Sequence, residues 1–185
     1  DTLSNYLSRM ADATANEAHW TRSLDRLQSV RIALQGGALA DDVARVLAAD
    51  GVEVCSPDQV RAQSSDLVVH VCADPEGPQL LMAADAAWES STRLLPVLLQ
   101  GSVLSVGPLI DRNFSACLRC AINHDAVIPT TSSVESGVVA AGVIAREVMA
   151  IGAGIGSSAL PLDCTRIDLA TFQTRFLPAV TRPGY

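Results

Sequence analysis

The sequence predicts an α/β protein with a Rossmann-like, mostly parallel mixed sheet and helices on both of its faces. Three observations support this prediction. A strand, a glycine turn, a helix and a second strand follow one another between residues 30 and 55, which is how a doubly wound sheet begins. A later run, LVVHVCA, is apolar throughout, as expected for a strand buried on both faces. The run LLPVLLQ is followed by a glycine turn and more apolar residues, which indicates a hairpin and an antiparallel section of the sheet.

The first part of the chain contains an arm and the opening of the sheet. Residues 1–27 have apolar positions at nearly helical spacing but no continuous stripe, so we interpret them as a helical arm or as the remnant of a preceding domain. Residues 28–185 are predicted to form one Rossmann-like domain. It should begin with the strand VRIAL at 30–34, the helix ALADDVARVLAADG ending before Gly51, and a strand at 52–55.

The middle of the chain should complete the parallel strands and then turn back. The expected elements are, in order, a short helix at 57–63, the strand LVVHVCA led by Ser65-Asp66, a helix at 78–89, the strand LLPVLLQ, a tight turn at Gly101-Ser102 and a strand from Ser102 to Ile110. Because the last two strands are joined by a tight turn, we expect the sheet to change from parallel to mixed at this point.

The last part of the chain should form a long helix and two strands. Ser132 precedes Glu135 by three residues, which is the spacing of a capping box, so a helix should extend from here to about Ile151. This helix is rich in alanine and glycine, which suits either a dimer surface or close packing on the sheet. Two final strands are expected in LPLDCTRIDL and TFQTRFLP, the second at an edge of the sheet.

Composition excludes several classes of function. The formal net charge of the 185 residues is −7, which argues against nucleic acid as a partner. All 13 basic residues are arginines, so there is no lysine for a Schiff base, a P-loop or a general base. The longest apolar run, Gly137 to Ala145, is far shorter than the roughly 20 residues of a membrane span, so no membrane partner is expected. Five cysteines, an odd number, with no signal-like N-terminus predict a cytoplasmic setting.

The C-x-x-C pair formed by Cys117 and Cys120 is the candidate metal site. Two thiolates at this spacing can bind one tetrahedral zinc ion, which then needs two further ligands. Three interpretations stay open: His124 or Cys164 is recruited, the chain is truncated before a second pair, or the site has lapsed. Redox catalysis is the weaker reading, because no strong helix is predicted to start at the pair. His70, inside an apolar strand, is expected to be a buried histidine with a hydrogen-bond partner.

The order of these elements, with VGPLI and ACLRCAINH following the hairpin, resembles the ThiF-like fold of ubiquitin-activating-type proteins. More narrowly, it resembles the ThiF-like partner proteins of azole-forming peptide cyclodehydratases, which are the leader-peptide-binding proteins of thiazole/oxazole-modified microcin clusters. The similarity covers residues 28–180 in outline, and the stretch from 94 to 124 is its specific part.

The resemblance implies a homodimeric scaffold in the modification of ribosomal peptides (RiPP biosynthesis). Such a protein would present a precursor leader peptide to a YcaO-type cyclodehydratase, which uses ATP to convert Cys, Ser or Thr side chains to azolines. Members of the superfamily often hold a structural zinc with two C-x-x-C pairs, and Cys117 and Cys120 would be one of them. Peptide capture by strand addition would use an edge such as TFQTRFLP.

The chain departs from the adenylating members of the superfamily at the nucleotide loop. Gly36, Gly37 and Asp74 stand where the resemblance places contacts to ATP and magnesium. However, the turn reads GGALAD, so the second and third glycines of G-x-G-x-x-G are lost, and Asp41 adds negative charge at the helix start. Asp74 is followed by Pro75 instead of the expected Asn and Arg. We therefore do not expect ATP as a cofactor or independent catalysis, and an active ATP-dependent adenylating enzyme is the alternative.

Overall fold

The structure is a computed structural model, and it describes residues 17–55, 65–74, 77–113, 115, 117–121, 134–155 and 163–178. Within these residues, the helices are α2 (Glu17–Ser29), α3 (Ala38–Ala49), α5 (Pro78–Glu89), α6 (Leu118–Ala121) and α7 (Val134–Ala153). The strands are β1 (Ile32–Gln35), β2 (Val54–Cys55), β3 (Leu67–Cys72), β4 (Arg93–Gln100), β5 (Val103–Val106), β6 (Asp163–Asp168) and β7 (Gln173–Pro178).

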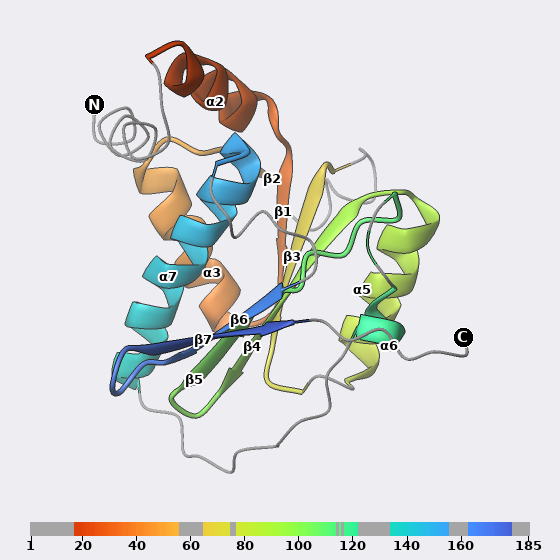
Figure 1. The fold of residues 1–185 in the computed structure, drawn as a ribbon. Coiled ribbons are helices and arrows are strands. Elements are labelled where there is room, and N and C mark those ends of the chain that lie inside the picture. Colours follow the sequence, from red (N-terminus) through yellow and green to blue (C-terminus); the bar gives the residue numbers. More distant parts are fainter. Residues whose placement is uncertain are drawn as a thin grey trace.

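All seven strands belong to one sheet, in the order β2-β1-β3-β4-β5-β6-β7. The first four strands of this order are parallel to one another, and β5, β6 and β7 each pair antiparallel with the preceding strand. Helices α2, α3 and α7 lie on one face, and α5 and α6 lie on the other (Figure 1). The predicted α/β fold with a mixed sheet and helices on both faces is confirmed, and so is the position of β7 at an edge.

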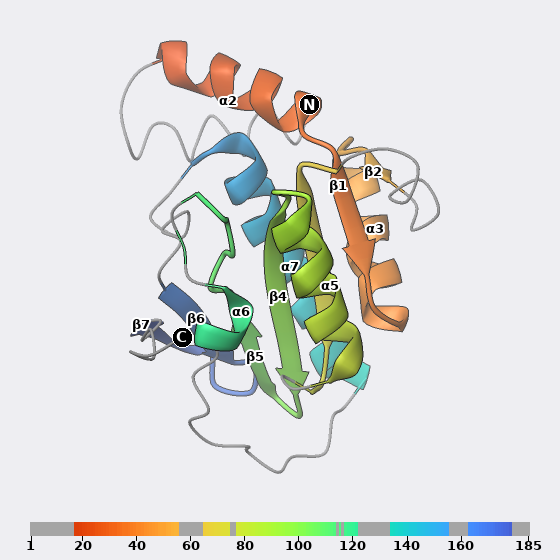
Figure 2. The ribbon, with the colours of Figure 1, turned by 90° about the vertical axis from the view of Figure 1, so that its right-hand side faces the viewer.

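The parallel strands separate two hydrophobic clusters because successive side chains point to opposite faces of the sheet. In β1, Ile32 packs in the cluster under α3 and α7, whereas its neighbour Ala33 packs in the cluster under α5. Leu67 and Val68 of β3 divide in the same way. This double burial explains why these strands read as continuous apolar runs in the sequence. Figure 2 shows α5 lying along the face of the sheet opposite α3 and α7.

Helix α7 packs on the sheet through one of its sides. Ala140, Ile144 and Val148 are fully or almost fully buried and lie in the larger cluster. Val138, on the opposite side, is 70% exposed. The small residues on one side of this helix therefore allow it to pack closely on the sheet. A role of the opposite side in dimerisation stays a prediction.

The hairpin differs from its predicted form. Strands β4 and β5 pair antiparallel as expected, from Val97↔Val106 to Gln100↔Val103, but β5 ends at Val106 instead of continuing to residue 110. The chain bends at a cis peptide bond between Gly107 and Pro108. Proline has no amide proton to donate to a ladder, so the strand cannot continue through it. Ile110 then forms an isolated antiparallel bridge with Leu94.

Helix α2 packs against α7, at the end where β1 begins. Leu27 is 2% exposed, and a side chain on Gly152 of α7 would approach its Cδ1 to 2.7 Å. Several predictions fall outside the described residues: the arm before Glu17, the helix at 57–63, Ser132 of the capping box, and His124. No helix of the described residues has both the length and the apolar character needed to cross a bilayer.

Candidate functional site

The carboxyl ends of β1 and β3 lie side by side at the point where the chain changes direction across the sheet. Helix α3 leads from β1 to β2 on one side, and α5 leads from β3 to β4 on the other. Open α/β sheets bind their ligands at such a switch point, outside the carboxyl ends of the strands. Gln35 and His70 occupy paired positions of β1 and β3 here, and Gly36 follows immediately.

Two cavities meet at this point and share Gln35 and Gly36. The first has a volume of about 640 Å³ and lies between α5 and the strands β1 and β3. His70 and Gln79 lie at the end of this cavity beside the switch point, and Met82 and alanines line it along α5. Its other end is lined by the hydroxyl residues Ser65, Ser90 and Thr92. The second has a volume of about 600 Å³ and lies between α3 and the strands β1 and β2. Its polar lining includes Asp41, Arg45 and Glu53.

His70 is a buried residue with a partner, as predicted. It is 5% exposed, and its Nδ1 lies 3.2 Å from Oε1 of Gln35, to which it can donate a proton. Burial lowers the pKa of His70 from its ordinary value of 6.5, so the imidazole is neutral at pH 7. The pair gives the first cavity uncharged hydrogen-bonding groups. Gln35 was not singled out from the sequence, although it is the polar residue that ends the first strand.

Gly36 and Gly37 differ in what they do. Gly36 has a φ of 124°, and a Cβ on it would overlap the carbonyl oxygen of Val71 in β3. Glycine is therefore required here for the turn and for the close approach of two strands. Gly37 is the N-cap of α3 and has nothing within 4 Å of a Cβ position. The close packing of Gly36 against β3 is thus enough to explain a glycine at this turn, with no need for a bound phosphate.

Negative charge gathers around the start of α3. Asp41 lies in the first turn of this helix and lines the second cavity, whereas Glu53 lines the other end of that cavity, just before β2. Arg45, the one arginine of that lining, is ion-paired with Asp42. Asp74 follows the end of β3, where it is exposed to solvent. Phosphates bind at helix N-termini because the backbone N–H groups and the helix dipole attract negative charge. Here the nearby carboxylates would repel a phosphate and oppose that attraction.

The thiols of Cys117 and Cys120 lie together, with their sulfur atoms 2.9 Å apart. The hydrogen bond to Cys117 raises the pKa of the Cys120 thiol. Cys117 immediately precedes α6, which is a single turn of four residues, so no long helix starts at the pair. Buried Leu118 and an ion pair of 3.0 Å between Arg119 and Asp85 hold α6 against α5. The backbone turns at this pair, where the amide of Cys120 donates to the carbonyl oxygen of Cys117 at 3.0 Å, and this turn brings the two sulfur atoms together.

The pair supplies half of a tetrahedral zinc set. In the part of the chain that the structure describes, no three His, Cys, Asp or Glu residues are grouped as metal ligands. Cys164, one of the proposed additional ligands, lies in β6, where burial raises the pKa of its thiol to about 11. His124 lies outside the described residues. Two thiolates fit zinc chemically, and further ligands would have to come from outside the described residues.

Several solved structures share this fold. The heterocyclase TruD superposes with a TM-score of 0.70 at 16% identity, over 89% of this chain and 28% of TruD. PaaA gives a TM-score of 0.71 at 13% identity, over 97% of this chain and 73% of PaaA. MccB from E. coli gives 0.69 at 11% identity, over 89% of this chain and 66% of MccB. Neither the protein-family models nor the curated proteins include a match to the sequence.

The fold is of the ThiF type. The identities of these matches are low, so they establish the architecture and leave activity to be argued from the residues. The chain spans 28% of the length of TruD, so it corresponds in fold to one part of that protein. Within this fold, Gly36 and Gly37 follow β1 and Asp74 follows β3 at the switch point, and their role in cofactor binding stays a prediction.

Proposed function

We propose that this chain is a non-catalytic, ThiF-like component of a peptide-modifying cyclodehydratase. In this role it binds a ribosomal precursor leader peptide and presents it to a YcaO-type enzyme that forms azolines. The likeness of its fold to the heterocyclase TruD supports this assignment. The observation that carries the non-catalytic part is the acidic switch point, where Asp41 occupies the first turn of α3 and Arg45 is already paired.

Charge and shape support the part of the proposal that assigns no nucleotide chemistry to this chain. A triphosphate needs cations and close backbone approach, and the chain has no lysine. The side chain of Asp41 stands at the position of the third glycine of the nucleotide turn and lines the second cavity. Repulsion between this carboxylate and a phosphate opposes binding at the helix start. ATP is therefore not assigned as a cofactor.

Strand β7 is the proposed site for the leader peptide. It is the outermost strand of the sheet beyond β6, and residues 173–176 are exposed. Its Phe176 is 67% exposed and Phe172, in the preceding turn, is 65% exposed. An extended peptide can add to such an edge through backbone hydrogen bonds while its side chains pack on exposed aromatic rings. This arrangement would bind the peptide with little dependence on charge.

A homodimer is the proposed assembly. Val138 of α7 is 70% exposed and Val139 is 36% exposed, on the side of the helix that does not face the sheet. Exposed large aliphatic side chains of this kind favour burial against a second surface. Sedimentation velocity measures the mass in solution, and a monomer at all concentrations would remove this part of the proposal.

Isothermal titration with the leader peptide tests the main proposal. We expect measurable heat with this chain alone or together with the YcaO-type partner, and about tenfold weaker binding for Phe176→Ala, because truncating a central anchor costs more than 1 kcal/mol. Gln28→Ala is the control, since Gln28 is exposed on α2, away from β7, and lines neither cavity. Heat in neither format contradicts the proposal.

The alternative, an active adenylating enzyme, has one observation in its favour. A structure of MccB with ATP shares the fold, with a TM-score of 0.65 at 13% identity. ATP–pyrophosphate exchange separates the two functions in the same protein preparation. A scaffold shows no exchange above the protein-free background, and peptide-dependent exchange would establish the enzyme.

We also propose that Cys117 and Cys120 contribute two ligands to a structural zinc ion. The contact of their sulfur atoms supports this, because one metal ion can bridge thiolates that already lie together. Elemental analysis should find zinc in the purified protein and lose it in Cys117→Ser. Cys72→Ser is the control, because that thiol lies at the end of β3. Zinc-free protein from zinc-supplemented growth would contradict the proposal.

A further inference from the structure

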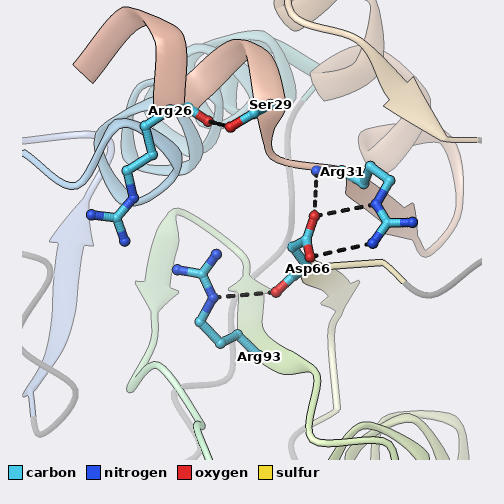
Figure 3. Close-up of polar contacts among 5 residues, drawn as sticks. All are labelled: Arg26, Ser29, Arg31, Asp66 and Arg93. Atoms are coloured by element: carbon cyan, nitrogen blue, oxygen red, sulfur yellow. Dashed lines mark hydrogen bonds and ion pairs between the residues drawn. The ribbon is translucent and has the colours of Figure 1, made fainter. Parts of the chain in front are cut away.

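A cluster of charged residues lies at the amino ends of the parallel strands, which is the end of the sheet opposite the switch point. Arg31 precedes β1, Asp66 precedes β3, and Arg93 is the first residue of β4. Because these strands are parallel, they all begin at the same end of the sheet, and residues far apart in the sequence lie close together here. Arg26, in the last turn of α2, joins them from above the sheet (Figure 3).

The carboxylate of Asp66 is committed to Arg31. Its Oδ2 accepts hydrogen bonds from the backbone nitrogen and Nε of Arg31 at 3.0 and 3.3 Å. Its Oδ1 accepts from a terminal nitrogen of the same arginine at 3.5 Å. Arg93 reaches Asp66 only through a bond of 3.2 Å from its Nε to the backbone carbonyl oxygen. The negative charge of Asp66 is therefore bound by Arg31, and neither Arg93 nor Arg26 forms an ion pair with this carboxylate.

The guanidinium groups of Arg26 and Arg93 face each other at the amino end of the sheet. Figure 3 shows the terminal nitrogens of Arg93 on the side of Arg26, and no contact joins the two side chains. Burial, and next the charge of Arg26, lower the pKa of Arg93, while the carboxylates of Asp111 and Asp66 act in the opposite direction. Among the described residues, the terminal nitrogens of both guanidinium groups make no hydrogen bond or ion pair.

The surrounding negative charge offsets that of the two arginines only in part, with the Asp111 carboxylate acting on Arg93 through its charge. Arg26 lies over Gly154, just beyond the carboxyl end of α7, where the helix dipole offers roughly half a negative charge. Asp111 is 7% exposed, and its Oδ1 already accepts from the backbone and side-chain nitrogens of Asn113. Like charges held together on a half-buried edge are stabilised when an anion is placed between them.

We propose that Arg26 and Arg93 together bind an oxyanion at the amino end of the sheet. The chemical class is a carboxylate or a phosphate, because planar guanidinium groups present paired donors that match two oxygen atoms of such a group. The site is separate from the switch point and from β7, so it does not depend on the proposed function. A carboxylate would come from an acidic peptide, and a phosphate from a free or small-molecule ligand.

Titration of the folded protein with inorganic phosphate and, separately, with sodium acetate tests the site, with ionic strength held constant by chloride. The readout is the side-chain Nε–H signals of the arginines by NMR. We expect saturable shifts with one of the anions, and about tenfold weaker binding in Arg26→Gln and in Arg93→Gln, since each charge-assisted hydrogen bond contributes at this level. The anion that saturates identifies the class of ligand.

Arg119→Gln is the matched control, because Arg119 is exposed and paired with Asp85 on α6 and α5. It should bind the anion as the wild type does. Arg26 is exposed, so Arg26→Gln is the decisive variant if Arg93→Gln fails to fold. If Arg26 only caps α7, its variant will lower the thermal midpoint equally with and without anion. That result, unsaturable shifts in the wild type, or wild-type affinity in Arg26→Gln would overturn the proposal.

Discussion

The two ends of the parallel sheet differ in how their charged side chains are arranged. At the carboxyl end, Asp41 and Asp74 lie beside the switch point, and Arg45 is ion-paired with Asp42. At the amino end, three arginines meet and the carboxylate of Asp66 is used by one of them. A Rossmann-like sheet that binds nucleotides places its affinity for anions at the carboxyl end. In this protein the cations lie at the opposite end.

This comparison separates the architecture of the fold from its chemistry. The glycine turn, the parallel strands and the switch point are kept because they are needed to pack the sheet. The electrostatic field is free to change, since surface charges contribute little to folding. Similar folds can therefore differ in which end attracts an anion, and fold likeness alone does not predict a ligand.

The largest expected effect concerns the glycine turn. Gly36→Ala should lower the free energy of unfolding by about 3 kcal/mol or more, because it combines a strained positive φ with a clash against the backbone of β3. Chemical denaturation measures the change. Gly37→Ala is the control, and its cost should stay within about 1 kcal/mol, since a Cβ there meets nothing.

Equal effects of the two substitutions would break the comparison, because the turn would then be kept for a reason other than packing. If Gly36→Ala were as stable as the wild type, the close approach of β1 and β3 would be wrong. The pair of variants thus tests whether the carboxyl end is built for structure.

A smaller effect is expected at the amino end. Burial alone would raise the pKa of Asp66, but hydrogen bonds from Arg31 and the charges of Arg31 and Arg93 hold it below its ordinary value of 3.8. The lowered pKa means that Asp66 stabilises the fold above pH 3.8 and loses this contribution as the pH falls through the lowered value. Asp66→Asn should cost about 1 kcal/mol or less at pH 7, because the pair is partly exposed.

The measurement is urea denaturation of wild type and Asp66→Asn at neutral pH and in acid. The difference in unfolding free energy should shrink as the pH falls. Asp85→Asn is the control, since its pair with Arg119 is more exposed, with side-chain exposures of 58% and 59%. A difference for Asp66→Asn that is constant with pH would show that the ionised carboxylate contributes nothing.

The fold could be predicted from the sequence because its signals are local. The continuous apolar run of β3 indicates burial on both faces, and Pro78 marks the beginning of α5 at its first turn. Where a signal depended on tertiary contacts, the prediction failed. The strand after Gly101 was expected to continue to residue 110, and only the bend at Pro108 and the bridge of Ile110 to Leu94 explain why it does not.

The candidate site was predicted in its positions but not in its surroundings. Gly36, Gly37 and the end of β3 could be placed because the strand order follows from the Rossmann opening. The contact of His70 with Gln35 and the pairing of Arg45 could not, since each depends on side-chain direction. The amino-end cluster had a usable signal: Arg31 and Asp66 each precede a strand, and Arg93 begins one.

Strand β4 has a consequence for how much change the chain can tolerate. It is the eight-residue strand that pairs parallel with β3 on one side and antiparallel with β5 on the other. Leu94 fills the cluster beneath α5, while Leu95 fills the one beneath α3 and α7. A single inserted residue here would swap both interiors at once and misalign both ladders. We therefore expect this segment to be the least tolerant of insertions, although only its first residue, Arg93, belongs to a proposed ligand site.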